Sequence, residues 1–256
     1  MPTQKQAWYS YDIKVYHAIL LSMLYQCAAT VKAKEEVAPF IYRFVFTLKD
    51  PPLISFTPGQ YILLQIPDGF RQYSISSAPS ESTRIETMVD VTPMGPGSRY
   101  LLQLKEGGVV NFRAPIGVFT LKENHRPKIL LATGTGIAPL KSMILHIAQQ
   151  QPVPDLYLFW GLRRKKDVYF TSLWSEINAK HPNFSYHICL SRERMDEPHY
   201  FNGHMQECIT SSITPEVAAQ ADWYLCGRPI VVESLVTFIQ QQYTVPKDRF
   251  FHEKYT

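Results

Sequence analysis

The segment RQYSISS, residues 71–77, places a cation, an aromatic ring and three hydroxyls within seven residues. It follows GQYILLQIP (59–67), an apolar run that a glycine and a proline bound and that is typical of a buried strand. A guanidinium can bind phosphate as a two-pronged donor, and a tyrosine ring can pack on a planar ligand. The alternative is that Tyr73 and Ser74 are an edge-strand pair that faces solvent.

A second stretch that could do chemistry is GTGIAPL (134–140), between a predicted strand and a predicted helix. Gly134 and Gly136 let the backbone approach a phosphate, and the first turn of a helix offers free N–H groups to it. Pro139 stands where a Rossmann fingerprint has glycine or alanine, so a plain glycine turn stays open as an alternative.

Cations follow three further predicted strands, in WGLRRKK (160–166), LSRER (190–194) and LCGRP (225–229). Ligands of open α/β sheets bind at the carboxyl ends of the strands, where an NAD site has an acidic residue near the second strand end. That position is basic here, and Asp155 starts the second strand rather than ending it. Ser191 and Arg192 could hold a 2′-phosphate, although each cation alone could be a solvated surface charge.

Two patterns of elements must position these stretches. From Thr30 the chain reads as short β runs with Gly, Pro and Asp between them, interrupted by a helical stretch at 97–104, which favours a six-stranded antiparallel β-barrel. After 122–127, apolar strands alternate with helical stretches, which favours a doubly wound parallel sheet. We therefore predict an α+β class domain at 29–123, an α/β domain at 124–256, and an N-terminal extension at 1–28.

The extension contains DIKVYHAILLSMLYQC (12–27), whose apolar residues recur at helical spacing. We expect a helix docked on the rest of the protein. A signal peptide fits less well, because Lys14 and His17 interrupt the apolar stretch. Membrane contact stays open.

The composition excludes several classes of function. The 256 residues are 45% hydrophobic and carry a formal charge of +4, which suits phosphate-bearing ligands or acidic partners but is too small to indicate nucleic acid binding. The four cysteines have neither a zinc nor an iron–sulfur spacing, so no metal is expected and a reducing, cytoplasmic location is favoured. No uncharged apolar run reaches 18 residues, so no spanning helix is expected.

With these features in order, residues 29–256 resemble the ferredoxin–NADP reductase superfamily, in its form that has only flavin and nicotinamide domains. Five segments carry the resemblance. RQYSISS (71–77) is similar to the family's flavin motif, and GPGSRYL (95–101) to its pyrophosphate turn. GTGIAP (134–139) is similar to its nicotinamide-nucleotide loop, CGRP (226–229) to its nicotinamide-side cysteine motif, and HEKY (252–255) to its C-terminal Glu-x-Tyr.

The resemblance implies a role for each site residue. Arg71 would bind an FAD phosphate, Tyr73 would pack on the isoalloxazine ring, and Ser74 would hydrogen-bond flavin N5. Gly97 and Ser98 would meet the FAD pyrophosphate. The resemblance and the strand ends together assign the following residues to the nicotinamide nucleotide: Thr133, Gly134, Thr135, Gly136, Pro139, Ser191, Arg192, Cys226 and Gly227. Tyr255 would cover the flavin face that nicotinamide must reach, and Glu253 would support electron or proton transfer. Ser74, Cys226 and Glu253 are thus the expected catalytic residues.

The resemblance further implies an FAD-dependent oxidoreductase that takes hydride from NADPH, or NADH, and passes electrons to a separate acceptor. A ferredoxin, a flavodoxin or an oxygenase component would serve, since the chain has no iron–sulfur cysteines. One alternative is a free-flavin reductase, against which the pyrophosphate turn argues. Another is a non-enzymatic regulatory subunit that binds a flavin or a nucleotide.

Overall fold

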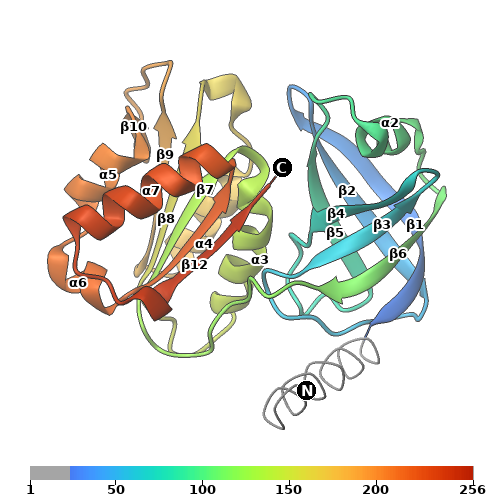
Figure 1. Ribbon diagram of the computed structural model, residues 1–256, viewed down its shortest axis with the longest axis horizontal. Coiled ribbons are helices and arrows are strands. Elements are labelled where there is room, and N and C mark those ends of the chain that lie inside the picture. The colour runs from blue at the N-terminus through green and yellow to red at the C-terminus, as the bar shows by residue number, and fades with distance from the viewer. Residues whose placement is uncertain (1–23, 256) are drawn as a thin grey trace, which may run out of the picture.

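The computed structural model describes residues 24–255, which form two sheets side by side (Figure 1). The first sheet is antiparallel, and its order is β4-β3-β6-β1-β2-β5. Its strands are β1 (Tyr25–Ala38), β2 (Ile41–Asp50), β3 (Tyr61–Ile66), β4 (Gly69–Ser74), β5 (Arg84–Asp90) and β6 (Val109–Ile116). A bridge between Ile75 and Thr87 joins the two outer strands, so the sheet closes into the expected barrel.

Side chains alternate between the inside and the outside of this barrel. Along β1, Cys27, Ala29 and Val31 are buried, while the residues between them are more exposed. Period-two burial of this kind follows from the pleat of a strand. One helix, α2 (Pro96–Gln103), lies at the barrel's rim between β5 and β6, where the helical stretch was predicted.

The start of β1 corrects one prediction. The helix expected over 12–27 is wrong at its C-terminal end, because Tyr25–Cys27 pair with Arg113 and its neighbours in β6 as a strand. Cys27 alternates in burial with its neighbours and so enters the barrel core as a strand residue. The rest of that predicted helix lies outside the described residues.

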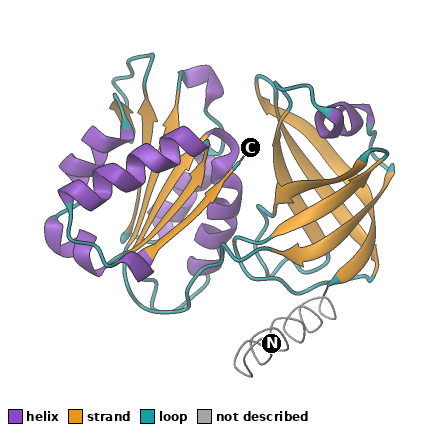
Figure 2. Cartoon of the chain, in the orientation of Figure 1, coloured by secondary structure: helices purple, strands orange, loops and turns teal. Residues whose placement is uncertain are grey.

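The second sheet is parallel, with the order β10-β9-β8-β7-β11-β12. Its strands are β7 (Lys128–Thr133), β8 (Leu156–Leu162), β9 (Phe184–Leu190), β10 (Tyr200–Asn202), β11 (Asp222–Gly227) and β12 (Phe250–Lys254). Its helices are α3 (Ile137–Ile147), α4 (Thr171–Lys180), α5 (Met205–Ser212), α6 (Pro215–Gln220) and α7 (Pro229–Gln242). The expected doubly wound parallel sheet is confirmed (Figure 2).

Both faces of this sheet are covered by helices. Leu130 and Ala132 of β7 pack in the cluster that includes residues of α3 and α4, whereas Ile129 and Leu131 pack with residues of α5 and α7. Strands buried on both sides read as continuous apolar runs, which is why KILLAT and DWYLCG were recognisable. The short β10 and α6 had no comparable signal.

The barrel and the parallel sheet share one apolar cluster. Met88, Phe119 and Leu121 from the barrel side belong to the same core as Leu140 and Met143 of α3. Helix α3 therefore lies between the second sheet and the barrel (Figure 1). Within residues 24–255, none of the helices combines the length and apolarity that crossing a bilayer requires.

Candidate active site

Three polar side chains meet where the barrel faces the end of the second sheet. Ser74 ends β4, and its hydroxyl shares a hydrogen bond of 2.8 Å with the Tyr255 hydroxyl. The same Ser74 hydroxyl donates to Glu253 Oε2 at 3.4 Å. The sequence separates these residues by about 180 positions, and the fold brings them together because β12 is the strand of the second sheet that ends beside the barrel.

Cys226 lies next to this group on the neighbouring strand. It is buried and pairs in register with Glu253, while the Tyr255 N–H donates to the Gly227 carbonyl at 3.0 Å. Burial raises the pKa of the Cys226 thiol well above its ordinary value, so the side chain is a small neutral group at physiological pH. The four predicted residues Ser74, Cys226, Glu253 and Tyr255 therefore form one cluster.

Burial also changes the acid–base properties of this cluster. Loss of solvent raises the pKa of Glu253 to about 7, against the opposing effect of the hydrogen bond from Ser74. Burial likewise raises the pKa of the Tyr255 hydroxyl well above its ordinary value. Glu253 is thus a carboxyl group that can hold or release a proton near neutral pH, a property that is common at catalytic sites.

On the barrel side, the structure offers a cradle that fits FAD. Arg71 and Tyr73 point from β4 to Gly97 in the first turn of α2, where a β-carbon would overlap the Tyr73 hydroxyl and lie 3.0 Å from Arg71 Cγ. The missing side chain of Gly97 therefore makes room for Tyr73 and Arg71 to lie against the first turn of α2, with Ser98 buried beside it. A cation, a ring and a helix N-terminus together form a donor set that suits the pyrophosphate and the ring system of FAD.

The GTG turn packs against the end of β11. A β-carbon on Gly136 would overlap the carbonyl of Cys226, and one on Gly227, whose φ is +148°, would overlap the Thr133 hydroxyl. The Trp160 indole N–H donates to the Gly134 carbonyl at 3.0 Å. These contacts hold the turn and the cysteine strand end as one block, which brings Thr133, Gly134, Gly136, Cys226 and Gly227 together.

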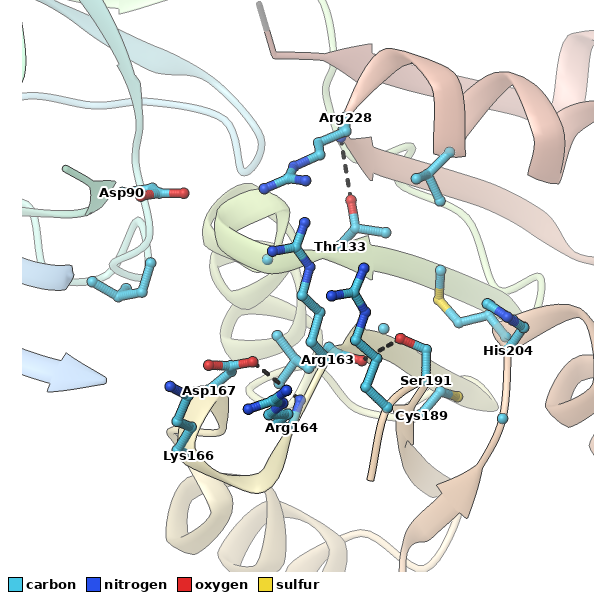
Figure 3. A pocket seen from close by; sticks show the side chains of 18 of the residues that line it. Asp90, Thr133, Arg163, Arg164, Lys166, Asp167, Cys189, Ser191, His204 and Arg228 are labelled. Carbon is cyan, nitrogen blue, oxygen red and sulfur yellow. Dashed lines mark hydrogen bonds between the residues drawn. The ribbon is translucent and has the colours of Figure 1, made fainter. Parts of the chain in front are cut away.

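A cleft of about 990 Å³ opens beside this block, between the second sheet and the barrel (Figure 3). Thr133, Gly134, Ser191 and Arg192 line it. The Ser191 N–H donates to the Leu162 carbonyl, and the Arg192 N–H donates to the Arg163 carbonyl. The basic residues that follow β8 and β9 therefore lie side by side. A volume of this size suits a dinucleotide-sized ligand.

The predicted nucleotide residues do not all line the cleft. Thr135 lies in the turn and is half-buried, and Pro139 is buried in the first turn of α3. Neither is among the residues that line the cleft within the described part of the chain, and the same holds for Gly136, Cys226 and Gly227. Their contact with a nucleotide stays a prediction.

The structure adds cleft residues that the sequence did not single out. Asp167 lines the cleft, and its carboxylate accepts a hydrogen bond of 3.0 Å from the Arg164 N–H (Figure 3). Phe40 lines it from the barrel side, 61% exposed and at a left-handed φ of +65°. No local pattern marks Phe40, but Asp167 follows the basic strand end directly and could have been found from its position.

With this geometry in view, comparisons with known proteins identify the architecture. Residues 28–121 match the family of oxidoreductase FAD-binding domains, and residues 130–237 match the family of oxidoreductase NAD-binding domains. Protein RfbI of Salmonella typhimurium is 32% identical over 241 residues, which cover 90% of this chain and 70% of that protein. The chain belongs to the ferredoxin–NADP reductase superfamily.

Other members of the ferredoxin–NADP reductase superfamily are similar over most of this chain. The toluate 1,2-dioxygenase electron transfer component of Pseudomonas putida is 34% identical over 207 residues, which are 79% of this chain and 59% of that protein. The crystal structure of the Amycolatopsis cytochrome P450 reductase GcoB aligns with a TM-score of 0.83 at 27% identity, covering 91% of this chain and 70% of that one. The chain thus spans less than two thirds of the length of the toluate component.

Proposed function

We propose that this member of the ferredoxin–NADP reductase superfamily is an FAD-dependent reductase that takes hydride from NADPH or NADH and passes electrons to a separate protein. The observation that carries the proposal is the cluster of Ser74, Glu253, Tyr255 and Cys226, which both domains contribute to. Names of relatives support an oxygenase component as the acceptor, since the toluate protein is an electron transfer component of a dioxygenase.

In this proposal each part of the site has a separate task. Arg71, Tyr73 and the first turn of α2 would hold FAD, which supplies the redox chemistry when it is bound. The GTG turn and the basic strand ends would hold the dinucleotide, and its nicotinamide end would have to reach Cys226, which is buried in this structure. Ser74 would orient the reacting ring by a hydrogen bond. Tyr255 would have to move aside, since its hydroxyl is now hydrogen-bonded to the Ser74 hydroxyl.

The function is tested by adding NADPH or NADH without oxygen to the purified protein and following the flavin absorbance. We expect FAD to copurify at about one per chain and to be bleached by at least one nucleotide. Flavin that does not stay bound would favour a free-flavin reductase instead, and bound flavin that neither nucleotide reduces would contradict the enzyme. A panel of oxygenase components, ferredoxins and flavodoxins then identifies the acceptor. A cytoplasmic location is part of the proposal and is supported by the four unpaired cysteines.

Glu253 predicts a pH dependence for this reaction. Hydride transfer adds negative charge beside the cluster, and an ionised carboxylate nearby opposes it. Because the pKa of Glu253 is raised to about 7, we expect the rate of flavin reduction to fall as the pH rises through 7. Glu253→Gln, which cannot ionise, should flatten the profile at the level of the low-pH rate. A profile that the substitution leaves unchanged would assign the titration to another group.

The same raised pKa fixes the sign of a stability effect. The folded state holds the Glu253 proton more tightly than the unfolded state does, so ionisation of this group opposes folding. Its contribution to stability is therefore greatest below its ordinary pKa and declines as the pH rises from there to about 7. The Tm of the wild type, measured relative to that of Glu253→Gln, should therefore fall as the pH rises from 4.5 to about 7.

The strand-end cations predict a preference for NADPH. A charge-assisted contact from Arg192 to the 2′-phosphate should favour NADPH over NADH at least about tenfold in kcat/KM. Arg192→Ala should remove most of this preference and leave kcat/KM for NADH unchanged. Arg194→Ala is the matched control, because this arginine is exposed and does not line the cleft within the described residues. An equal loss for both nucleotides would mean that Arg192 does not read the phosphate.

A further inference from the structure

A buried ion pair crosses the boundary between the two domains close to the active-site cluster. Glu86 of β5 and Lys141 of α3 are each only 6% exposed, and Lys141 Nζ lies 2.7 Å from Glu86 Oε1. Glu86 also accepts hydrogen bonds of 2.7 Å from Ser76 Oγ and from Arg43 Nε. Both carboxylate oxygens of Glu86 therefore accept hydrogen bonds, and the donors come from both domains.

These partners keep the Glu86 carboxylate ionised. Burial by itself would raise its pKa, but the attraction of Lys141 and Arg43, with hydrogen bonds from Lys141 and Ser76, holds the pKa below its ordinary value. The Glu86 carboxylate is therefore ionised at physiological pH. Its geometry is restricted, since a buried charge that loses its partner is costly.

The same helix, α3, also donates hydrogen bonds to the segment that follows Ser74. Lys141 Nζ donates to the Ser76 carbonyl at 3.1 Å, and the next residue, Ser142, donates through its hydroxyl to the Ser77 carbonyl at 2.7 Å. On the other side, the Ser76 N–H donates to the Glu86 carbonyl at 2.8 Å. Ser76 and Ser77, which follow Ser74 closely in the chain, are thus held between β5 and α3.

Helix α3 connects these hydrogen bonds to the nucleotide side of the site. Lys141 lies five residues after Gly136, which is about 7.5 Å along a helix, and Gly136 packs directly on the Cys226 carbonyl. A rigid path therefore runs from Ser74 through Ser76, Lys141 and Gly136 to Cys226. The two ends of this path are the residues proposed to meet the flavin and the nicotinamide.

Apolar contacts also join the two domains beside this pair. Met88, Phe119 and Leu121 of the barrel side already pack with Leu140 and Met143 of α3 in one apolar core. Apolar contacts are not directional, whereas a buried pair with several hydrogen bonds tolerates one arrangement. The pair is therefore suited to set the relative position of the two domains.

We propose that Lys141, paired with Glu86, is a positioning residue that sets the distance between the flavin strand and the nicotinamide end of the cleft. It contacts neither ligand in this proposal, which rests on the proposed function. A misplacement of about 1 Å between reacting groups can slow a reaction by roughly a hundredfold. The pair thus controls the rate of hydride transfer rather than the binding of either FAD or NADPH.

The test uses Lys141→Met in the FAD-loaded protein, since methionine keeps most of the length of the side chain without its charge, and Arg43 and Ser76 still contact Glu86. We expect the single-turnover rate of flavin reduction by NADPH to fall at least about tenfold. The dissociation constant of NADPH and the FAD content should stay within about threefold. Reduction of the flavin by dithionite, which needs no nicotinamide site, should not change.

A matched buried pair inside the second domain provides the control. Lys128 Nζ lies 3.0 Å from Asp222 Oδ2, and both side chains are 1% exposed. These residues begin β7 and β11, at the opposite end of those strands from the cleft. Lys128→Met should lower the Tm as Lys141→Met does, but leave the reduction rate unchanged. Equal rate losses in the two variants would show a general stability effect and overturn the proposal.

Hydrogen exchange provides a readout that does not depend on activity. We expect amides 74–77 to exchange faster in Lys141→Met than in the wild type, with no such change in Lys128→Met. Ser142→Ala, which removes one hydrogen bond and leaves no buried charge, should show the same effects in weaker form if Lys141→Met folds poorly. Unchanged exchange at 74–77, or an unchanged reduction rate, would overturn the positioning role. A wild type that neither nucleotide reduces would instead refute the proposed function, and the exchange experiment would still decide on the hydrogen bonds from α3.

Discussion

Gly97→Ala is expected to lower the affinity for FAD by about a hundredfold. A methyl group at this position would overlap the Tyr73 hydroxyl and lie 3.0 Å from Arg71 Cγ, so both side chains would have to move. The overlap strains the free protein as well, so the loss of affinity comes from the displaced Arg71, whose charge-assisted contact to a phosphate is worth about 1.5–3 kcal/mol. The upper end of this range corresponds to roughly a hundredfold in a dissociation constant.

The same turn contains the control. Gly95 precedes α2, has an ordinary φ of −68°, and would meet no atom within 4 Å if it carried a β-carbon. Gly95→Ala should therefore bind FAD as the wild type does. The measurement is titration of the flavin-free protein with FAD, followed by the quenching of flavin fluorescence. Similar affinities for Gly97→Ala and the wild type would place the FAD phosphates elsewhere.

Much of this architecture could be predicted from the sequence because the relevant signals are local. The stretch LCGRP (225–229) is an example, since its glycine ends β11 and its proline begins α7. The cluster at Ser74 could be assembled only through the resemblance to a family. No periodicity in the sequence places Glu253 and Tyr255 beside β4.

What could not be predicted depends on contacts between distant residues. Glu86 and Lys141 are 55 residues apart, and each taken alone reads as an ordinary surface charge. Phe40 lies at the tip of a hairpin and reaches the cleft only because the barrel faces the second sheet there. Tyr25 was misassigned for a related reason, since its strand exists through pairing with β6. Such pairings need the tertiary structure.

The site also combines two demands that one domain could not meet. Ser74 must face a ring held by the barrel, and Cys226 must face a nucleotide held by the second sheet, in the proposed function. The strand order makes this possible, because β12 and the end of β11 are the parts of the second sheet that reach Ser74. The hydrogen bond between Ser74 and Tyr255 therefore joins the two halves of the site.

Ser74→Ala is expected to slow flavin reduction by NADPH about a hundredfold while FAD stays bound. The hydroxyl is buried at the end of β4, and its hydrogen bonds to Tyr255 and Glu253 fix its direction toward the cluster. Removing one preorganised donor where charge develops costs roughly a hundredfold or more in rate. Binding of FAD should persist, because the cradle of Arg71, Tyr73 and Gly97 does not include this hydroxyl.

Stopped-flow absorbance at saturating NADPH measures this rate, and the flavin spectrum of the purified variant measures the FAD content. Ser80→Ala is the control, since Ser80 is an exposed serine in the turn after the same segment. The expected outcome is a slow Ser74→Ala and an unaltered Ser80→Ala, both with full FAD. A Ser74→Ala protein that is reduced as fast as the wild type would remove the hydroxyl from the reaction. Loss of FAD from that variant would instead make Ser74 a binding residue, and the hydrogen bond to Tyr255 would then serve only to close the site.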